Sequence, residues 1–393
     1  MANSLLTIDQ ITNEALRLAH EKASFIGTIN RQFDSSFGQS DGKIGDTLRI
    51  RKPSQYTRRQ GSRVMDVQDA EEQNTTLVTA TQDGVDMRFN SRELSLDLQN
   101  FSQHHLEPAM AAMISGIESD VLQGCTKLTY NLAGTAGTAP ADLAAVGAAR
   151  AKLNQNLAPK DGNRCIQMDS VTMGTLVNGL KGLFQDSNQI KEQYREGMVG
   201  RTAMADFYEN ERTWAITNGA DVAGAIDQTS FTNGLSTLTV DAYTAAATVG
   251  SVFTIAGVKQ VHPETKASYS HEQQFTVTAA TTTSITFSPA MYWEGARQNV
   301  DHMPSENDVI THVGSASTAY QQNLMYHKDA FTFATADLPI MADAAKCVTK
   351  SYDGLSVRVW QQSDIRNDEL LTRIDMLYGY AAIRPEWASR ITS

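Results

Sequence analysis

Cysteine is scarce in this sequence of 393 residues, which contains only Cys125, Cys165 and Cys347. The three cysteines are widely separated and odd in number, and they form neither a CxxC pair nor a Cys/His spacing suited to zinc. A disulfide framework and a zinc site therefore have no support in the sequence. The pattern favours a reducing, cytosolic environment during synthesis.

Long apolar segments are missing as well. No run of apolar residues approaches the ~18 residues from which a membrane-spanning helix is read. The first ten residues, MANSLLTIDQ, have neither the basic start nor the apolar centre of a secretory signal peptide. We therefore expect no membrane partner and no export signal.

Basic residues are outnumbered by acidic ones, with 33 Lys and Arg against 44 Asp and Glu, so the formal net charge is −11. A protein whose main task is to grip nucleic acid usually shows a net basic balance or a basic stripe. The balance therefore argues against that class. Because 20% of the residues are charged and 41% are hydrophobic, the chain is not a disordered one. Its length suits two or three domains of about 150 residues each.

Catalytic and cofactor-binding motifs are missing from the sequence. It contains no GxSxG motif, no P-loop and no GxGxxG motif. His104 and His105 precede Glu107, but adjacent histidines point to different sides of a helix, so a solvated helix start is favoured over a metal site. The pairs His20-Glu21 and His271-Glu272 lack the second histidine of HExxH. We predict no catalytic, cofactor-binding or metal site and no enzymatic activity, and a hydrolase has no supporting motif.

The most informative segment that is present runs from Gly250 to Ala279. Its two stretches VFTIAGV and QQFTVTA alternate apolar and polar residues at the period of a β-strand, and a polar connection containing Pro263 joins them. A third short strand, SITFSP, follows, within a region rich in Thr, Ala, Gly and Ser from about 221 to 317. We expect an all-β, barrel-like module with these core residues: Phe253, Ile255, Val258, Phe275, Val277, Ile285 and Phe287.

The flanking sequence predicts mixed helices and strands. Helical periodicity extends over 5–33, over a short segment from Asn90 through Leu98, over a long helix to about Leu128, and over 140–159. Ile117 and Val121 share the apolar stripe of the long helix, and we expect them to face a sheet near Ile374 and Met376. RCIQMDS reads as a strand, and RIDMLYGYAAIRPEWASRI reads as a final strand that ends at Pro385.

A long hairpin is predicted at 46–89 from the alternating segments TLRIRKP and TTLVTATQDGVDMRF. Basic residues come first in its wide polar tip and acidic residues follow. Because neither run can be buried without partners, we expect the tip to be solvated or to contact another molecule. The acidic run would weaken a grip on phosphates, so contacts between subunits are favoured over nucleic acid. The predicted contact residues are Arg58, Arg59, Arg63, Asp69, Glu71 and Glu72.

The order of these parts, together with FTIAGVKQVHPETKASYSHEQQFTVTA, NLMYHKDAFTFATADLP and RIDMLYGYAAIRPEWA, resembles the major capsid (coat) proteins of tailed bacteriophages. The likeness is to the branch that carries an all-β insertion domain. It implies an α+β tailed-phage major capsid fold. The implied parts are an N-terminal arm (1–45), an extended loop hairpin (46–89), a peripheral domain with a spine helix (90–133 and 340–393), an axial domain (134–220 and 318–339) and a β insertion domain (221–317).

The resemblance also implies a function. The protein would assemble with itself, as hexamers and pentamers, into an icosahedral shell around double-stranded phage DNA, which it would touch only weakly. A scaffolding protein and a portal protein would be its other partners, in a virion assembled in the cytoplasm of a bacterial host, with no cofactor. Two alternatives remain open: a non-viral nanocompartment shell of the same fold, against which the insertion domain argues, and a virion decoration or glycan-binding module.

Overall fold

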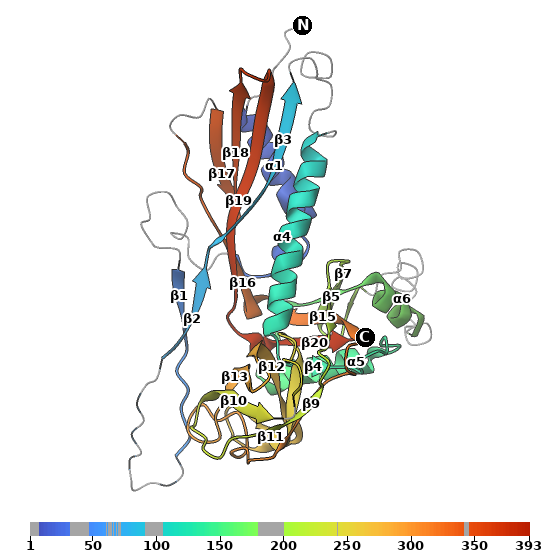
Figure 1. Cartoon of the computed structure of the whole chain (residues 1–393), viewed down its shortest axis with the longest axis vertical. Coiled ribbons are helices and arrows are strands. Elements are labelled where there is room, and N and C mark those ends of the chain that lie inside the picture. The colour runs from blue at the N-terminus through green and yellow to red at the C-terminus, as the bar shows by residue number, and fades with distance from the viewer. Residues whose placement is uncertain are drawn as a thin grey trace. The chain divides into compact units, whose positions relative to one another are not determined.

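The computed structural model describes residues 8–31, 47–59, 61, 65, 67, 69, 72–90, 105–179, 200–241, 243–341 and 346–393 (Figure 1). The chain folds into two compact units. The first unit comprises Met1–Ile50, Thr75–Val121 and Phe331–Ile383, and the second comprises Arg51–Asn74, Leu122–Ala330 and Arg384–Ser393. Each unit combines helices with antiparallel or mixed sheet, as the α+β prediction requires.

A five-stranded antiparallel sheet forms the centre of the first unit. Its order is β16-β19-β18-β17, and β3 pairs with β19. One end of β19 pairs with β3, and its other end pairs with β16. The bounds of the strands are β3 Thr81–Asn90, β16 Phe331–Ala336, β17 Lys346–Tyr352, β18 Leu355–Asp364 and β19 Glu369–Ala382. Segments far apart in the sequence therefore build one sheet.

Helix α4 (Glu107–Leu128) is the predicted long helix, and its apolar stripe is buried. Ile117 and Val121 are both fully buried, as predicted, and Ile374 is fully buried on β19. The helix reaches the strand through Tyr378, whose hydroxyl donates a hydrogen bond to Asp120 Oδ2 at 3.3 Å. The stripe therefore covers an apolar interior, because the 3.6-residue period places these side chains on one face.

The N-terminal helical prediction is wrong in its continuity. Two helices, α1 (Ile8–Lys22) and α2 (Phe25–Thr28), are present in place of one continuous helix. Helix α1 packs against β17 and β18. The amide of Phe25 instead donates to the buried carboxylate of Glu118 on α4, which ties the new helix start to the long helix. Glu118 thus accepts a hydrogen bond from a backbone N–H group that, in a continuous helix, would have bonded to a carbonyl oxygen of the same helix.

The hairpin prediction is corrected in its second strand. Strands β1 (Thr47–Lys52) and β2 (Gln73–Val78) form a two-stranded sheet, whereas β3 pairs with β19 in the sheet of the first unit. TTLVTATQDGVDMRF is therefore two strands with different partners. Alternation shows on which face of a sheet a side chain lies, but it does not show which other strand the segment pairs with.

The second unit contains a seven-stranded sheet of order β4-β20-β15-β5-β7-β6, with β8 also paired to β15. Helices α5 (Leu143–Gln155) and α6 (Ser170–Gly179) flank it, and Asp142 caps α5 by accepting from the Ala144 amide at 2.8 Å. Strand β5 is the predicted RCIQMDS strand. The bounds of the strands are β4 Leu132–Ala133, β5 Arg164–Met168, β6 Arg201–Thr202, β7 Ala205–Glu209, β8 Trp214–Thr217, β15 Ala319–His327 and β20 Ala388–Thr392.

A closed six-stranded barrel, of order β10-β13-β12-β11-β14-β9, lies within the second unit. All seven predicted core residues of this module are buried in one apolar cluster. Phe275 stacks on Phe253 at 5.6 Å between ring centroids and meets the Phe287 ring edge-on at 5.1 Å. The barrel-like prediction is confirmed. The bounds are β9 Ala223–Ile226, β10 Leu235–Asp241, β11 Val252–Val261, β12 Ser268–Ala280, β13 Ser284–Met291 and β14 Val309–His312.

The predicted end of the chain is also corrected. Strand β19 stops at Ala382, a short turn of helix (η3, Pro385–Trp387) follows, and β20 then pairs with β15 and β4 in the sheet of the second unit. A second short turn, η2 (Lys328–Ala330), links β15 to β16. All five residues of β20 are buried, including Ser389 and Arg390. A short strand rich in polar residues carries no alternating apolar signal, which is why the sequence did not show it. The short helix expected from Asn90 through Leu98, beyond its first residue, lies outside the described residues.

Candidate inter-subunit contact site

The base of the hairpin is held by apolar contacts. Ile50 on β1 and Leu77 on β2 are buried in a cluster with Ala381 and Ile383. These residues alternate with exposed neighbours along both strands. Burial of one face fixes the register of the pair, because a slip by one residue would turn that face outward. The strands therefore carry the connecting loop, residues 53–72, from a fixed base.

The predicted contact residues are exposed where the structure describes them. Arg58, Arg59, Asp69 and Glu72 all lie on the surface of the loop. Arg63 and Glu71 lie outside the described residues. Exposure leaves the four charges available to a second molecule.

The structure brings together only part of the predicted charge pattern. Arg51 Nη1 lies 3.4 Å from Glu72 Oε2, and both side chains are more than half exposed. Within the described part of the loop, Arg58, Arg59 and Asp69 form no ion pair. An exposed pair contributes at most about 1 kcal/mol, so Arg51–Glu72 is a weak tie at the root of the loop. Arg51 belongs to the basic run of the sequence but was not among the predicted contact residues.

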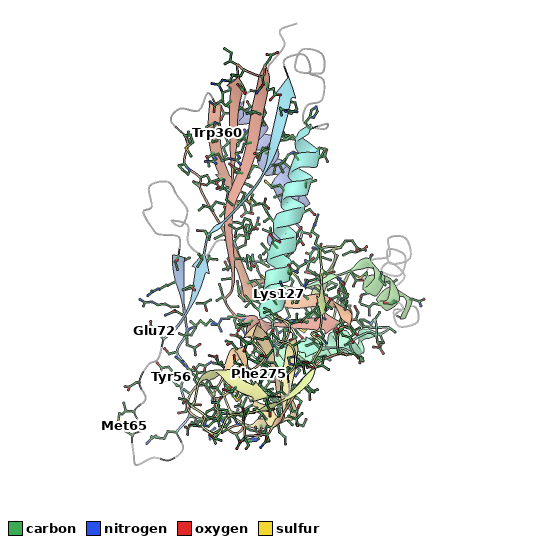
Figure 2. The ribbon with its side chains drawn as sticks, viewed as in Figure 1. Tyr56, Met65, Glu72, Lys127, Phe275 and Trp360 are labelled. Carbon is green, nitrogen blue, oxygen red and sulfur yellow. The ribbon has the colours of Figure 1, made fainter. Side chains whose placement is uncertain are left out.

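Exposed apolar side chains on the same loop escaped the sequence analysis. The exposed fractions are 59% for Tyr56, 81% for Met65 and 78% for Val67, and Figure 2 shows Tyr56, Met65 and Glu72 along the loop. Single exposed apolar residues are common, but three on one loop mark a surface that gains free energy when a partner covers it. These apolar residues lie in the segments QYT and MDV. The prediction for this stretch considered only its charged residues.

A buried serine, histidine and tyrosine form a hydrogen-bonded chain in the barrel that is similar in its order to a catalytic triad. Ser251 Oγ lies 3.1 Å from His312 Nδ1, and Tyr243 Oη lies 2.9 Å from His312 Nε2. All three residues are buried. Burial lowers the pKa of His312 to about 4 and raises the pKa of Tyr243. Hydrogen bonds at both ring nitrogens satisfy this neutral, buried imidazole. In a Ser–His–Asp triad a carboxylate stabilises the imidazolium, whereas here the hydroxyl of Tyr243 occupies the position of that carboxylate.

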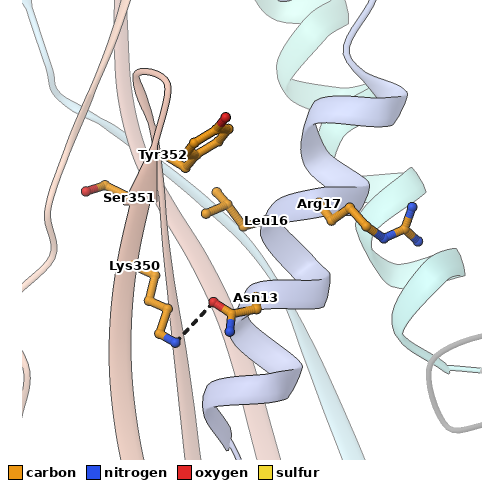
Figure 3. A pocket seen from close by; sticks show the side chains of 6 residues that line it. All are labelled: Asn13, Leu16, Arg17, Lys350, Ser351 and Tyr352. Atoms are coloured by element: carbon orange, nitrogen blue, oxygen red, sulfur yellow. Dashed lines mark hydrogen bonds between the residues drawn. The ribbon is translucent and has the colours of Figure 1, made fainter.

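Two surface hollows of the described residues were compared with a catalytic pocket by the side chains that line them. The hollow in Figure 3 has a volume of about 470 Å³ and lies between α1 and the end of β17. Leu16 and Tyr352 face it, and Lys350 Nζ donates to Asn13 Oδ1 at 3.1 Å. Another hollow, of about 360 Å³, lies over β3, β18 and β19 beside Trp360 and Leu371. Both are shallow surfaces without a nucleophile and base in contact.

Among the residues that the structure describes, no group of three or more His, Cys, Asp or Glu side chains is placed to hold a metal ion. His105, from the predicted His104-His105 pair, instead packs edge-on against Phe89 at 5.1 Å. No described helix combines the length and the apolar character needed to cross a bilayer.

The comparisons with known proteins decide the family. The sequence profile described as "P22 coat protein - gene protein 5" matches residues 72–390, which is most of the chain. The chain belongs to the P22 coat protein family. It is a major capsid protein, and the family favours neither a nanocompartment shell nor a decoration module.

A solved structure agrees on the fold. The chain is similar to a structure from Mycobacterium phage Che8, with 11% identity over 94% of this chain and 90% of that one and a TM-score of 0.50. It is also similar to the capsid of the Helicobacter pylori bacteriophage KHP30 (11% identity, 89% and 85% covered, TM-score 0.45). The CUS-3 coat protein I-domain matches at 28% identity over 25% of this chain and 99% of that one, with a TM-score of 0.20. None of the curated proteins matches the chain.

The predicted tailed-phage capsid fold with a barrel insertion is therefore confirmed. As a coat protein, the chain is a structural component of the virion and assembles with copies of itself into a shell.

Proposed function

We propose that the shell is icosahedral, built from hexamers and pentamers, and encloses double-stranded phage DNA. The hairpin loop carries this proposal, because it presents charged and apolar side chains that its own subunit leaves uncovered. Each loop would lie on a neighbouring subunit. Many weak contacts of this kind add up over a closed symmetric lattice.

The net charge of −11 suits a container for DNA. A shell that confines a polyanion without binding it tightly needs an interior that does not attract phosphates over its whole area. We therefore propose weak, non-specific contact with packaged DNA. A scaffolding protein, a portal protein and assembly in the bacterial cytoplasm complete this proposal.

The domain limits are part of the same proposal: an N-terminal arm at 1–45, the extended loop at 46–89, a peripheral domain at 90–133 and 340–393, an axial domain at 134–220 and 318–339, and the insertion at 221–317. The pairing of β3 with β19 supports ending the extended loop before β3. The barrel strands, which run from Ala223 to His312, support the last of these limits. The entry of β20 into the sheet of the second unit supports moving the last ten residues to the axial domain.

Electron microscopy of the purified protein tests the proposed function. Closed icosahedral shells are the expected result, because a coat subunit with an uncovered loop needs neighbours. Exclusively monomeric particles, with or without scaffolding protein, would contradict it.

The loop contact is tested by replacing Met65 and Val67 together with serine. The doubly substituted subunit should remain folded, as circular dichroism would show, but should form fewer shells because it presents less apolar surface to its neighbour. Val309→Ser provides the matched control, since Val309 is 49% exposed on barrel strand β14. Equal shell yields from both variants would contradict the contact.

A further inference from the structure

A buried arginine joins the C-terminal strand to the barrel. Arg390 on β20 is 1% exposed. Its Nη1 donates to the Gly250 carbonyl oxygen at 2.6 Å, and its Nη2 donates to the Lys127 carbonyl oxygen and to Thr276 Oγ1, both at 3.0 Å. These acceptors are neutral oxygens from the end of α4, the loop before β11, and β12. The guanidinium therefore ties the sheet and the barrel of the second unit together.

These three hydrogen bonds engage the two Nη atoms of the guanidinium and do not involve Nε. Among the described residues, Arg390 Nε is buried and has no hydrogen-bond partner. Gln322 on the neighbouring strand β15 is in the complementary situation. Its Nε2 donates to Thr392 Oγ1 at 3.0 Å, whereas its Oε1 is buried without a partner in the same set of residues. A buried donor and a buried acceptor, each unsatisfied, are unfavourable unless something bridges them.

Both side chains line one small cavity. Its other polar lining residues include Ser251 and Asn218, and it offers about 10 Å³ of room to a water-sized sphere. A single water molecule needs roughly 10–15 Å³ on this scale, together with two to four polar partners. The cavity therefore has the size and the chemistry for one water and no space for a larger ligand.

We propose that one ordered water molecule occupies this cavity. It accepts a hydrogen bond from Arg390 Nε and donates one to Gln322 Oε1. Through Arg390 it connects β15 to the barrel and completes the polar junction that holds the barrel on the sheet. A buried water that satisfies two such groups behaves as part of the fold.

An anion fits the cavity less well than water does. Chloride would accept from Arg390 Nε, but it would also face the lone pairs of Gln322 Oε1. In the structure, Gln322 Nε2 donates to Thr392 Oγ1, and Oε1 is the buried amide atom that lacks a partner among the described residues. Water serves both groups, because it donates and accepts.

A density map of the purified protein, at a resolution that shows ordered water, tests the proposal. The expected result is one peak within hydrogen-bonding distance of both Arg390 Nε and Gln322 Oε1. A direct bond between these two atoms, an empty cavity, or a peak that bromide replaces would overturn it.

Gln322→Leu removes the acceptor. The peak should disappear, and the melting temperature should fall further than in Gln321→Leu, which removes a half-buried amide bond to Thr213 outside the cavity. A peak that persists in Gln322→Leu would overturn the assigned partner. If this variant does not fold, the map of the unsubstituted protein still decides whether the water is present.

Discussion

At the scale of single residues, Phe275 shows how one aromatic side chain supports a whole module. It is fully buried and contacts the rings of Phe253 and Phe287. Phe275→Ala should lower the free energy of unfolding of the barrel by roughly 3–5 kcal/mol, because it removes transfer free energy and leaves a cavity. Denaturant unfolding of the subunit measures the change. Val309→Ala, at a half-exposed position of the same barrel, should change it by less than about 1 kcal/mol. Equal effects would place Phe275 outside the core.

His312 makes the stability of the barrel depend on pH. Burial lowers its pKa from 6.5 to about 4, so between these values the unfolded chain binds a proton that the folded chain does not. Stability should therefore be fully present above pH 6.5 and should fall as the pH drops toward 4, by up to about 1.4 kcal/mol per unit. Urea unfolding at several pH values measures the slope. His312→Gln should flatten it over this window, and an unchanged slope would assign the dependence to carboxylates instead.

At the scale of elements, a substitution in helix α4 tests whether the apolar face of the helix packs in the interior. Ile117→Asp would place a carboxylate at a fully buried position, at a cost of several kcal/mol or with a raised pKa. The expected result is insoluble subunit, measured by the soluble fraction after expression. Ala112→Asp changes an exposed position of the same helix and should remain soluble. Soluble Ile117→Asp protein that forms normal shells would show that Ile117 does not pack in the interior.

Regular patterns made some elements predictable and left others hidden. Period-two alternation identified the barrel core because inward-facing positions such as Phe253 and Ile255 must be apolar. The break between α1 and α2 was hidden, since Phe25 and Ile26 continue the helical stripe while Glu118, distant in sequence, caps the second helix. The pairing of β3 with β19 was also hidden, because β19 is distant from β3 in the sequence. Partners far along the chain decide such features, and local pattern does not name them.

The candidate site was predictable to a similar degree. Segregated charge showed that the loop is exposed, because unpaired charges cannot be buried. The exposure of Met65 and Val67 could not be predicted, since the same residues would fill a core if the loop packed on its own subunit. The cavity beside Arg390 depends on three segments meeting, and a single arginine in a short strand gives no sign of it.

At the scale of the whole molecule, we propose that the hairpin loop connects the subunit to the lattice, and substitution of its charged residues tests this role. Arg58→Glu together with Arg59→Glu should reduce the yield of shells while the subunit remains folded, because both side chains are exposed and would meet acidic groups of a neighbour. The loss in one contact is small, at about 0–1 kcal/mol per exposed pair, but it is repeated at every subunit interface.

Sedimentation and electron microscopy would measure the yield, and circular dichroism would confirm folding. Arg58→Lys with Arg59→Lys is the matched control, since it retains both charges and should assemble normally. Added salt should narrow the difference in yield between the two variants, because it screens exposed charges beyond about 8–10 Å. Normal shells from the glutamate variant at low salt would show that the loop meets its neighbour through the apolar side chains of Tyr56, Met65 and Val67 rather than through charge.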